Sequence, residues 1–234
     1  MKEGIILAGG LGTRLQSIVS DLPKSMAEVA GRPFLEYLFD YAADQKFNHI
    51  ILSLGYKADV VIDWLKSQHR PFEISYVIES SPLGTGGAIK YAFEKILGKE
   101  AFVINGDTFF DVDTHAFLEF HKANRADISV ALKPMIDFDR YGSVTLNNQQ
   151  RIVSFNEKQY CAQGLINGGI YVVNTELFKK IDLPEIFSFE KDIMESYINQ
   201  LGIYGLVQDN YFIDIGIPSD FEIANKDFTN SRKK

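Results

Sequence analysis

Three glycines and an arginine follow the first apolar run of the chain, in the stretch Gly9-Gly10-Leu11-Gly12-Thr13-Arg14, and Lys24 comes ten residues after Arg14. The turn is not a Walker P-loop, because no Gly-Lys-Ser/Thr closes it, and Leu15 stands where a dinucleotide fingerprint needs its third glycine. Backbone N–H groups in such a turn can approach phosphate oxygens closely. We therefore predict a triphosphate site with two cations. The alternative, a plain strand-to-helix turn, needs fewer glycines and no arginine.

Two acidic residues stand at the ends of later apolar runs. Asp107 follows the run Ala101–Asn105, and Glu79 comes directly before the loop 80–87. Ligands bind beyond the carboxyl ends of the strands in an open parallel sheet, so both acids should face one site. A carboxylate only accepts hydrogen bonds, and guanine presents two adjacent donors, so Glu79 favours guanine over uracil or thymine. The alternative is that Glu79 is a solvent-facing strand end.

Charge and cysteine content exclude several classes of protein. The chain has 234 residues and a net charge of −7, and its one basic run is the terminal SRKK, so we expect no nucleic-acid partner. The single cysteine, Cys161, leaves no internal disulfide, and the four histidines show no zinc-ligand spacing. No apolar run approaches the roughly 20 residues of a membrane span, and the N-terminus does not resemble a signal peptide. We expect a cytoplasmic protein without a membrane partner.

The elements that must position these residues alternate in the first half of the chain. Runs typical of buried parallel strands are Glu3–Ala8, Asn48–Leu54, Glu73–Ile78 and Ala101–Asn105, and helical spacing occurs in Pro33–Lys46, Lys57–His69 and Gly86–Leu97. This order predicts the α/β class, with a three-layer α/β/α arrangement around a mostly parallel, Rossmann-like sheet.

Strands dominate the second half. We predict them at Ile128–Leu132, Ser143–Leu146, Arg151–Phe155, Ile170–Val173 and Ile203–Val207, with helices near Glu190–Gln200 and Ser219–Asp227. Because no proline-, glycine- or serine-rich linker divides the chain, we predict a single domain over residues 1–234 with two lobes, about 1–110 and about 111–234.

The motifs GGLGTRL, LPKSM, VAGRPFLEYLFD, LGTGG, NGD, FNEK, INGGIYV and FIDIGIPSD occur in this order and span nearly the whole chain. Together they resemble the signature of the sugar-1-phosphate nucleotidyltransferases, also called nucleotide-sugar pyrophosphorylases. Within that family the chain is most similar to the D-glycero-D-manno-heptose 1-phosphate guanylyltransferases, notably in PLGTGGAI and NGDTFFDVD. Ser17 departs from the family, since many relatives have a loop-shaping proline there. The resemblance implies a GT-A-like sheet, and the segment after FIDIGIPSD is too short for the C-terminal β-helix of some relatives.

The reaction implied by this resemblance joins a nucleoside triphosphate to a sugar 1-phosphate and releases pyrophosphate. A sugar 1-phosphate is already an anionic nucleophile, so catalysis needs alignment and charge neutralisation rather than a general base. Arg14 and Lys24 are the expected catalytic cations. By resemblance, Asp107 and Asp214 hold Mg²⁺, an ion that prefers carboxylate and phosphate oxygens. Asp113 lies nearby in sequence, but we predict that it caps a helix.

The resemblance also distributes the substrates over the two lobes. The nucleotide is expected to contact Leu7, Ala8, Gly9, Gly10, Gly12, Thr13, Glu79, Pro82, Gly84, Thr85 and Asp107. The sugar phosphate is expected to contact Tyr141, Gly142, Glu157, Lys158, Asn167 and Gly168, with Glu157 on sugar hydroxyls and Lys158 on the phosphate. Taken alone, Glu157 and Lys158 would be a solvated charge pair in a turn. Their place in the order of motifs favours the site.

We predict GTP and D-glycero-α-D-manno-heptose 1-phosphate as substrates, and GDP-heptose for cell-surface polysaccharide as the product. The alternatives are mannose 1-phosphate guanylyl transfer, uridylyl or thymidylyl transfer to a hexose or amino-sugar phosphate, and a non-catalytic regulatory homologue that binds a nucleotide-sugar. Loss of Arg14, Lys24, Asp107 or Asp214 would favour the regulatory homologue, and all four are present. The sequence leaves open the sugar, its anomer and the oligomeric state, a homo-oligomer included.

Overall fold

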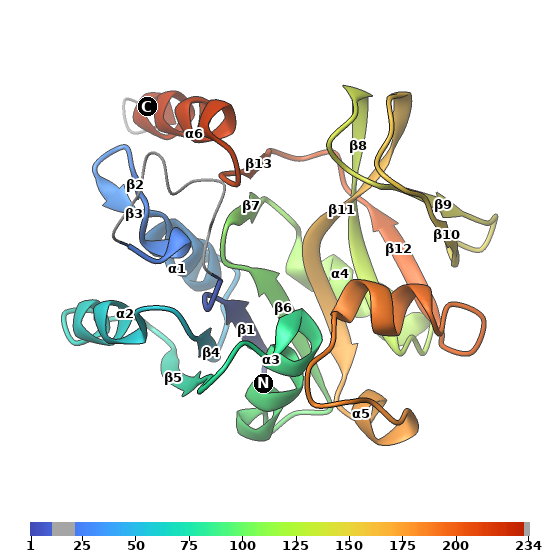
Figure 1. Cartoon of the computed structure of the whole chain (residues 1–234), viewed down its shortest axis with the longest axis horizontal. Coiled ribbons are helices and arrows are strands. Elements are labelled where there is room, and N and C mark those ends of the chain that lie inside the picture. The colour runs from blue at the N-terminus through green and yellow to red at the C-terminus, as the bar shows by residue number, and fades with distance from the viewer. Residues whose placement is uncertain (11–21, 232–234) are drawn as a thin grey trace.

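The computed structural model describes residues 1–10 and 22–231, and in them one sheet of nine strands runs through both halves of the chain (Figure 1). The strands of the first half are β1 (Glu3–Leu7), β4 (His49–Leu54), β5 (Glu73–Ile78) and β6 (Glu100–Asn105). They are parallel, in the order β6-β1-β4-β5. The four predicted strands are confirmed, each within one residue at either end. Their runs of Ile and Val fit strands that are covered on both faces.

The second half continues this sheet with antiparallel pairing. Its strands are β8 (Ile128–Phe138), β9 (Ser143–Leu146), β10 (Ile152–Phe155), β11 (Cys161–Asn174) and β12 (Ile203–Val207). β11 runs antiparallel to β6, β8 and β9, whereas β12 runs parallel to β8. β8 and β11 are much longer than predicted, because their outer parts pair with each other through Pro134 and Leu165. The sheet is thus mixed, and its parallel part is the half formed by β1, β4, β5 and β6.

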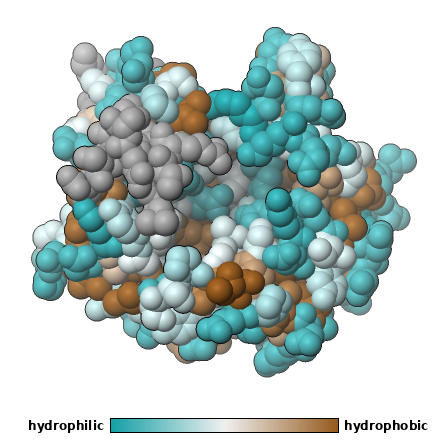
Figure 2. Space-filling view, in the orientation of Figure 1, coloured by the Kyte–Doolittle hydropathy of each residue, from teal (hydrophilic) through white to brown (hydrophobic). Residues whose placement is uncertain are grey.

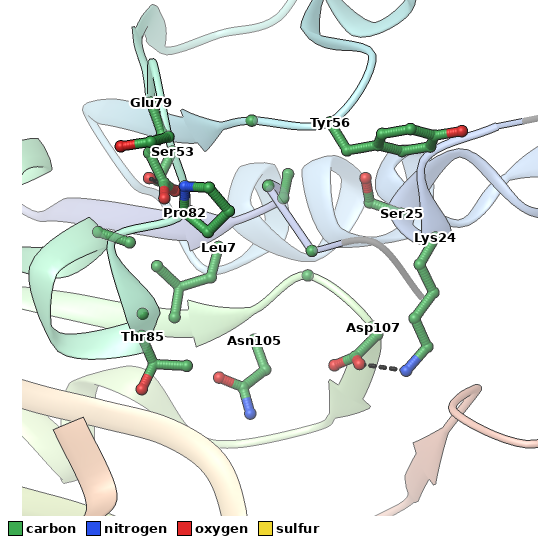
Figure 3. A pocket seen from close by; sticks show the side chains of 18 of the residues that line it. Leu7, Lys24, Ser25, Ser53, Tyr56, Glu79, Pro82, Thr85, Asn105 and Asp107 are labelled. Carbon is green, nitrogen blue, oxygen red and sulfur yellow. Dashed lines mark hydrogen bonds and ion pairs between the residues drawn. The ribbon is translucent and has the colours of Figure 1, made fainter. Parts of the chain in front are cut away.

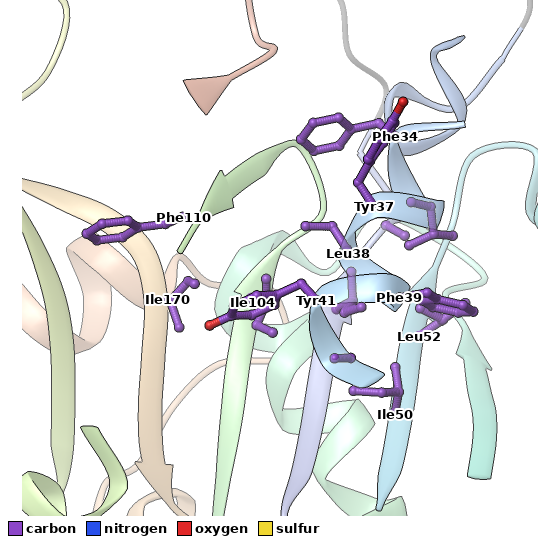
Figure 4. Packing of buried hydrophobic residues seen from close by; sticks show 14 of the residues in the cluster. Phe34, Tyr37, Leu38, Phe39, Tyr41, Ile50, Leu52, Ile104, Phe110 and Ile170 are labelled. Carbon is purple, nitrogen blue, oxygen red and sulfur yellow. The ribbon is translucent and has the colours of Figure 1, made fainter. Parts of the chain in front are cut away.

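Helices cover both faces of the sheet, which confirms the three-layer prediction. One face carries α1 (Phe34–Asp44), α2 (Ala58–Leu65), α4 (Thr114–Ala123) and α6 (Pro218–Ser231), and the other carries α3 (Gly84–Ala92), α5 (Leu177–Lys180) and a π-helix, Phe189–Glu195. Neighbouring strand residues point to opposite faces, so Ile6 packs with the α1 layer and Ile5 with the α3 layer. Figure 4 shows Leu38 and Phe39 of α1 beside Leu52 of β4.

The helices differ from the predicted ranges mainly at their ends. α2 stops at Leu65 instead of His69, and the segment after α3 tightens into a 3-10 turn, Phe93–Lys95. The segment predicted as a helix near Glu190–Gln200 forms the π-helix instead, a geometry that occurs often at functional sites. Asp113 caps α4 as predicted, because its carboxylate accepts hydrogen bonds from the backbone N–H groups of His115 and Ala116.

Two short ribbons were not predicted. β2 (Glu28–Val29) pairs with β3 (Arg32–Pro33), and β7 (Thr108–Phe110) pairs with β13 (Phe212–Asp214). The β7–β13 ribbon places Asp214 opposite Thr108, next to the end of β6. It therefore brings two distant acidic motifs of the chain together. No helix in the described ranges has the length and apolar character needed to cross a bilayer.

Candidate active site

A cavity of about 590 Å³ opens at the carboxyl ends of β1, β4, β5 and β6 (Figure 3). Its volume is that of a typical small-molecule site. The lining residues are Leu7, Ala8, Gly9, Gly10, Lys24, Ser25, Ser53, Gly55, Tyr56, Glu79, Ser80, Ser81, Pro82, Gly84, Thr85, Ala88, Asn105, Gly106 and Asp107. Figure 2 shows this face of the molecule hollowed near its centre, with hydrophilic residues along the upper right of the hollow.

The cavity gathers the first-lobe residues predicted from the sequence, as far as the structure describes them. Lys24 and nine of the predicted nucleotide contacts line it: Leu7, Ala8, Gly9, Gly10, Glu79, Pro82, Gly84, Thr85 and Asp107. The predicted residues Gly12, Thr13 and Arg14 lie outside the described residues. Sequence reasoning missed Ser25, Asn105 and the segment around Tyr56. Tyr56 follows the end of β4, so the strand-end rule applied to that strand would have found it.

The glycines of the LGTGG motif are explained by packing inside the protein. Gly84 has a φ of +73°, and a Cβ there would lie 2.5 Å from the carbonyl oxygen of Phe187. The backbone N–H of Gly86 donates to the same carbonyl at 3.0 Å. These glycines let the start of α3 lie directly on the segment before the π-helix. The motif therefore shapes the cavity wall through backbone contact.

Glu79 lies at the cavity and already accepts two hydrogen bonds from the protein. Its Oε2 accepts from the backbone N–H of Leu83 at 2.9 Å, and its Oε1 accepts from the hydroxyl of Ser53 at 3.3 Å. The carboxylate thus holds the loop 80–83 in place. Each carboxylate oxygen has a second lone pair, so Glu79 can accept further hydrogen bonds from a ligand in the cavity. Glu79 is more than the solvent-facing strand end that the sequence left as an alternative.

A compact charged group forms the other end of the cavity. Lys24 follows Pro23 in a short 3-10 turn, and its ammonium forms an ion pair with Asp107 (dashed in Figure 3). The same Nζ lies 3.9 Å from Oδ1 of Asp214, which also accepts the backbone N–H of Gly216 at 2.7 Å. Burial raises the pKa of Asp214, the Asp107 carboxylate raises it further, and the Lys24 ammonium lowers it. Two carboxylates are therefore held close enough to repel each other, with one ammonium between them.

This donor set fits a divalent cation. Carboxylates combined with substrate phosphates are the ligands that Mg²⁺ prefers in proteins. In the described ranges no group of three or more histidine, cysteine, aspartate or glutamate side chains could hold a metal. An ion bound by Asp107 and Asp214 would accordingly complete its shell with phosphate oxygens and water. The two carboxylates lie close enough to repel each other, and a divalent cation between them would relieve this repulsion.

Asn167 and Gly168 of the second lobe lie beside the cavity without lining it. They belong to β11, whose next residues pair with β6 so that Ile170 stands opposite Ile104. Asn167 donates to the hydroxyl of Tyr171 at 2.8 Å, and its Oδ1 accepts the backbone N–H of Gly169 at 3.0 Å. This arrangement places the predicted sugar residues next to Asn105 of the cavity wall.

Glu190 connects the two lobes and was missed from the sequence. Its Oε2 accepts from the hydroxyl of Thr85 at 2.7 Å, and its Oε1 accepts from the hydroxyl of Tyr171 at 3.4 Å. Burial raises the pKa of Tyr171, and the neighbouring Glu190 carboxylate adds to the shift. A chain of hydrogen bonds thus runs from Asn167 through Tyr171 and Glu190 to Thr85. The π-helix thus supplies the residue that joins the Thr85 side of the cavity wall to the second lobe.

The remaining predicted sugar residues flank the charged end. The ring of Tyr141 packs edge-on against Phe212, with 6.1 Å between ring centroids. Burial raises the pKa of Tyr141, and Asp214 adds to the shift, so the phenol lies near the carboxylate pair. A Cβ on Gly142 would lie 2.6 Å from the carbonyl oxygen of Asn156, so the two loops are in contact.

Glu157 and Lys158 follow directly after Asn156 and are exposed. Neither side chain has an ion-pair or hydrogen-bond partner among the residues that the structure describes. Their head groups are therefore available to a ligand. The structure brings the loops of Tyr141 and Lys158 together but does not place Glu157 or Lys158 in the cavity wall.

A glycine turn at the end of a parallel strand, with a lysine and two carboxylates beside it, is typical of a nucleotide-binding transferase. The chain belongs to the nucleotidyl transferase family, whose model matches residues 3–231. A D-glycero-alpha-D-manno-heptose 1-phosphate guanylyltransferase of Aneurinibacillus thermoaerophilus is 47% identical, over 96% of this chain and 97% of that protein. One of the same name from Campylobacter jejuni subsp. jejuni is 47% identical, over 94% of this chain and 96% of its own.

Solved structures agree with these sequence relatives. The crystal structure of HddC from Yersinia pseudotuberculosis superposes with a TM-score of 0.89 at 39% identity, over 97% of this chain and 100% of that one. The same protein complexed with GMP-PN gives a TM-score of 0.87 at 38% identity, with the same coverage. The α/β nucleotidyltransferase fold is therefore confirmed. Members of this family generally use a divalent metal ion, which agrees with the carboxylate pair.

Proposed function

We propose that this enzyme condenses GTP with D-glycero-α-D-manno-heptose 1-phosphate to form GDP-heptose and pyrophosphate. The observation that carries the proposal is the layout of the cavity, with the acceptor-only carboxylate of Glu79 at one end and Lys24 and Asp107, next to Asp214, at the other. The first end suits a guanine edge with two donors, and the second suits phosphates. The names of the two bacterial relatives that match over nearly their full length support the same substrates.

In this proposal the guanine base lies near Glu79 and Pro82, and the phosphates extend toward Gly9, Gly10 and Lys24. Gly12, Thr13 and Arg14 are proposed to complete the triphosphate site. Asp107 and Asp214 would hold Mg²⁺, which supplies positive charge to the α-phosphate and the departing pyrophosphate. Charge neutralisation and alignment are the main requirements of such a transfer.

The sugar phosphate is proposed to enter from the second lobe. Lys158 would pair with its phosphate and Glu157 with its hydroxyls, while the Tyr141–Gly142 loop and the Asn167–Gly168 segment line the sugar. A phosphate oxygen of the sugar then attacks the α-phosphorus in line. The new P–O bond forms as the bond to the β-phosphate breaks, and pyrophosphate leaves with the electron pair. No proton needs to move, because the nucleophile is already an anion.

A substrate matrix tests the proposal. Pyrophosphate release should be measured with GTP, UTP and dTTP against D-glycero-D-manno-heptose 1-phosphate, mannose 1-phosphate and glucose 1-phosphate. We expect the highest kcat/KM for GTP with the heptose phosphate. Equal or better use of mannose 1-phosphate would overturn the sugar assignment and leave the guanylyl transfer intact. Absence of pyrophosphate release with every pair would favour a nucleotide-sugar-binding regulator.

A pair of variants tests the division between the lobes. Lys158→Ala should mainly raise KM for the sugar 1-phosphate, because it removes a charged partner of that substrate alone. Lys179→Ala is a matched control, since Lys179 is an exposed lysine on α5 that pairs with Glu176. If Lys158→Ala instead raises KM for GTP and leaves KM for the sugar 1-phosphate unchanged, the assignment of the two substrates to the two lobes is reversed.

We further propose that the two lobes form one domain and that the enzyme works in the cytoplasm. The continuity of one sheet through both halves supports the first point, since β6 of the first lobe pairs with β11 of the second. Denaturant unfolding followed by fluorescence and by circular dichroism should give coincident transitions, and two separate transitions would contradict it. Cell fractionation tests the second point.

A further inference from the structure

The hydroxyl of Ser25 has no hydrogen-bond partner among the residues that the structure describes. Ser25 is 3% exposed, and its Oγ is the one buried side-chain nitrogen or oxygen without a partner in the described part of the chain. Folded proteins pair nearly all such atoms, because an unpaired buried hydroxyl has lost its hydrogen bonds to water and gained none in return. A partner supplied by another state of the protein would account for a serine at this position.

The position of Ser25 indicates what that partner is. Ser25 lines the same cavity as Lys24 and Gly10, at the charged end. Figure 3 shows Ser25 and Tyr56 on the side of Lys24, across the cavity from Glu79 and Pro82. If the base lies at Glu79 and the attacked α-phosphate near Asp107, the end around Ser25 receives the outer phosphates. This step rests on the function proposed above.

The backbone of Ser25 is fixed, so the serine is a preformed donor. The N–H of Met26 donates to the carbonyl of Pro23 at 2.8 Å, and the N–H of Ala27 donates to the carbonyl of Lys24 at 3.0 Å. Met26 and Ala27 are both buried in the core under α1. Only the Ser25 side chain is left to adjust: its χ1 angle has three staggered positions for Oγ, and the hydroxyl proton rotates about the Cβ–Oγ bond.

An uncharged hydrogen-bond donor suits a phosphate at this end of the cavity, because Lys24 already interacts with two carboxylates. The Lys24 ammonium forms an ion pair with Asp107 and lies near Asp214. These two carboxylates therefore neutralise part of the positive charge that Lys24 could offer to a phosphate. The ionised oxygens of a phosphate accept hydrogen bonds and do not donate them. A hydroxyl beside Lys24 can therefore orient an outer phosphate without adding charge that would also attract the carboxylates.

We propose that Ser25 is a binding residue for the pyrophosphate portion of the nucleotide, and that its Oγ–H donates to a non-bridging oxygen of the β- or γ-phosphate. The hydrogen bond forms when the triphosphate binds, and it is retained with the pyrophosphate after the bond between the α- and β-phosphates has broken. Ser25 thus belongs to the leaving-group site, and the free enzyme keeps an unpaired hydroxyl ready for it.

The variant Ser25→Ala separates this role from a structural one. Without nucleotide, its melting temperature should rise by about 3 °C, because an unpaired buried hydroxyl is removed. With Mg²⁺ present, its Kd for GTP should increase about tenfold, the loss expected for one hydrogen bond to a charged acceptor. Its Kd for GMP, which lacks the outer phosphates, should stay unchanged. KM for pyrophosphate in the reverse reaction should rise with the Kd for GTP.

Ser129→Ala is the matched control, because Ser129 is fully buried but its hydroxyl has a partner, Nδ1 of His121 at 2.9 Å. This variant should lose thermal stability and bind GTP normally. The proposal is overturned if Ser25→Ala melts lower than wild type, or if its Kd for GTP is unchanged. Equal weakening of GTP and GMP would place Ser25 at the α-phosphate and refute the leaving-group assignment. Failure of the wild-type protein to bind GTP would instead refute the proposed function.

Discussion

Replacement of Lys24 by methionine removes the ammonium between Asp107 and Asp214 and keeps an apolar stem of similar length. One charge pair at about 4 Å attracts with about 4 kcal/mol at the dielectric typical of a protein surface. The Lys24, Asp107 and Asp214 side chains are 16%, 34% and 29% exposed, so water compensates for only part of that attraction. We expect the free energy of unfolding of Lys24→Met to fall by about 2 kcal/mol. This value lies between those for exposed ion pairs and for buried charges that lose their partner. This corresponds to a fall in melting temperature of about 6 °C.

A divalent ion should reverse much of this loss. In the variant, Mg²⁺ meets two carboxylates that no ammonium occupies, so millimolar Mg²⁺ should raise the melting temperature of Lys24→Met more than that of wild type. Turnover should stay very low, since the cation that we propose to bind the phosphates is gone. Thermal unfolding with a chelator and with Mg²⁺ measures both effects.

Lys133→Met is the control for this experiment. The Lys133 side chain is 17% exposed, like that of Lys24, but its partner Asp209 is 76% exposed and can be hydrated when the lysine is lost. The free energy of unfolding of Lys133→Met should fall by less than about 1 kcal/mol, and its response to Mg²⁺ should match that of wild type. Lys24 does not hold the two carboxylates together if Lys24→Met loses no more stability than this control, or if Mg²⁺ shifts the melting temperatures of the variant and wild type equally.

Three further predictions concern single residues. Asp214→Asn should lower kcat by about a hundredfold or more while retaining or raising the melting temperature in chelator, because the raised pKa shows that the charged form is disfavoured in the fold; near-normal turnover in Mg²⁺ would contradict the metal assignment. Wild type should prefer GTP over UTP by about a hundredfold in kcat/KM, and Glu79→Gln should shrink that preference, whereas equal use of UTP by wild type would refute the guanine assignment. Burial lowers the pKa of His121 from 6.5 to about 4, against the opposing pull of Glu100 and Asp127. The unfolded chain therefore binds this proton more readily, so stability should fall as pH drops below 6.5 and lose about 3 kcal/mol by pH 4; denaturant unfolding across this range should show a smaller loss in His121→Gln, and an identical loss would exclude His121 as the cause.

The parallel strands were the most predictable part of the fold. β1, β4, β5 and β6 lie between two helical layers, so each appears in the sequence as an apolar run bounded by turn residues. The outer parts of β8 and β11 were not predicted, because Pro134 and Gly164 interrupt the apolar pattern where the two strands pair with each other. β7 and β13 have three residues each, too few for any periodicity, and their pairing depends on where the whole chain folds.

The candidate site divides in the same way. Residues at strand ends, such as Glu79 and Asp107, were predictable because parallel topology alone places them on one edge of the sheet. Glu190 was not, since its contact with Thr85 arises from a π-helix that packs on α3. Ser25 gave no signal at all, because burial and the lack of a partner are properties of the folded chain.

The β7–β13 ribbon has a consequence for the making of the protein. Asp214 reaches Asp107 only when Phe212–Asp214 pairs with Thr108–Phe110, and translation produces these two segments far apart in time. A growing chain on the ribosome can already carry the glycine turn, Lys24 and Asp107, yet it lacks the second carboxylate until its last strand emerges. Incomplete chains released from the ribosome before β13 is translated would therefore lack Asp214, one of the two carboxylates. Under the proposed metal assignment, nucleotide chemistry can start only after β13 has been made.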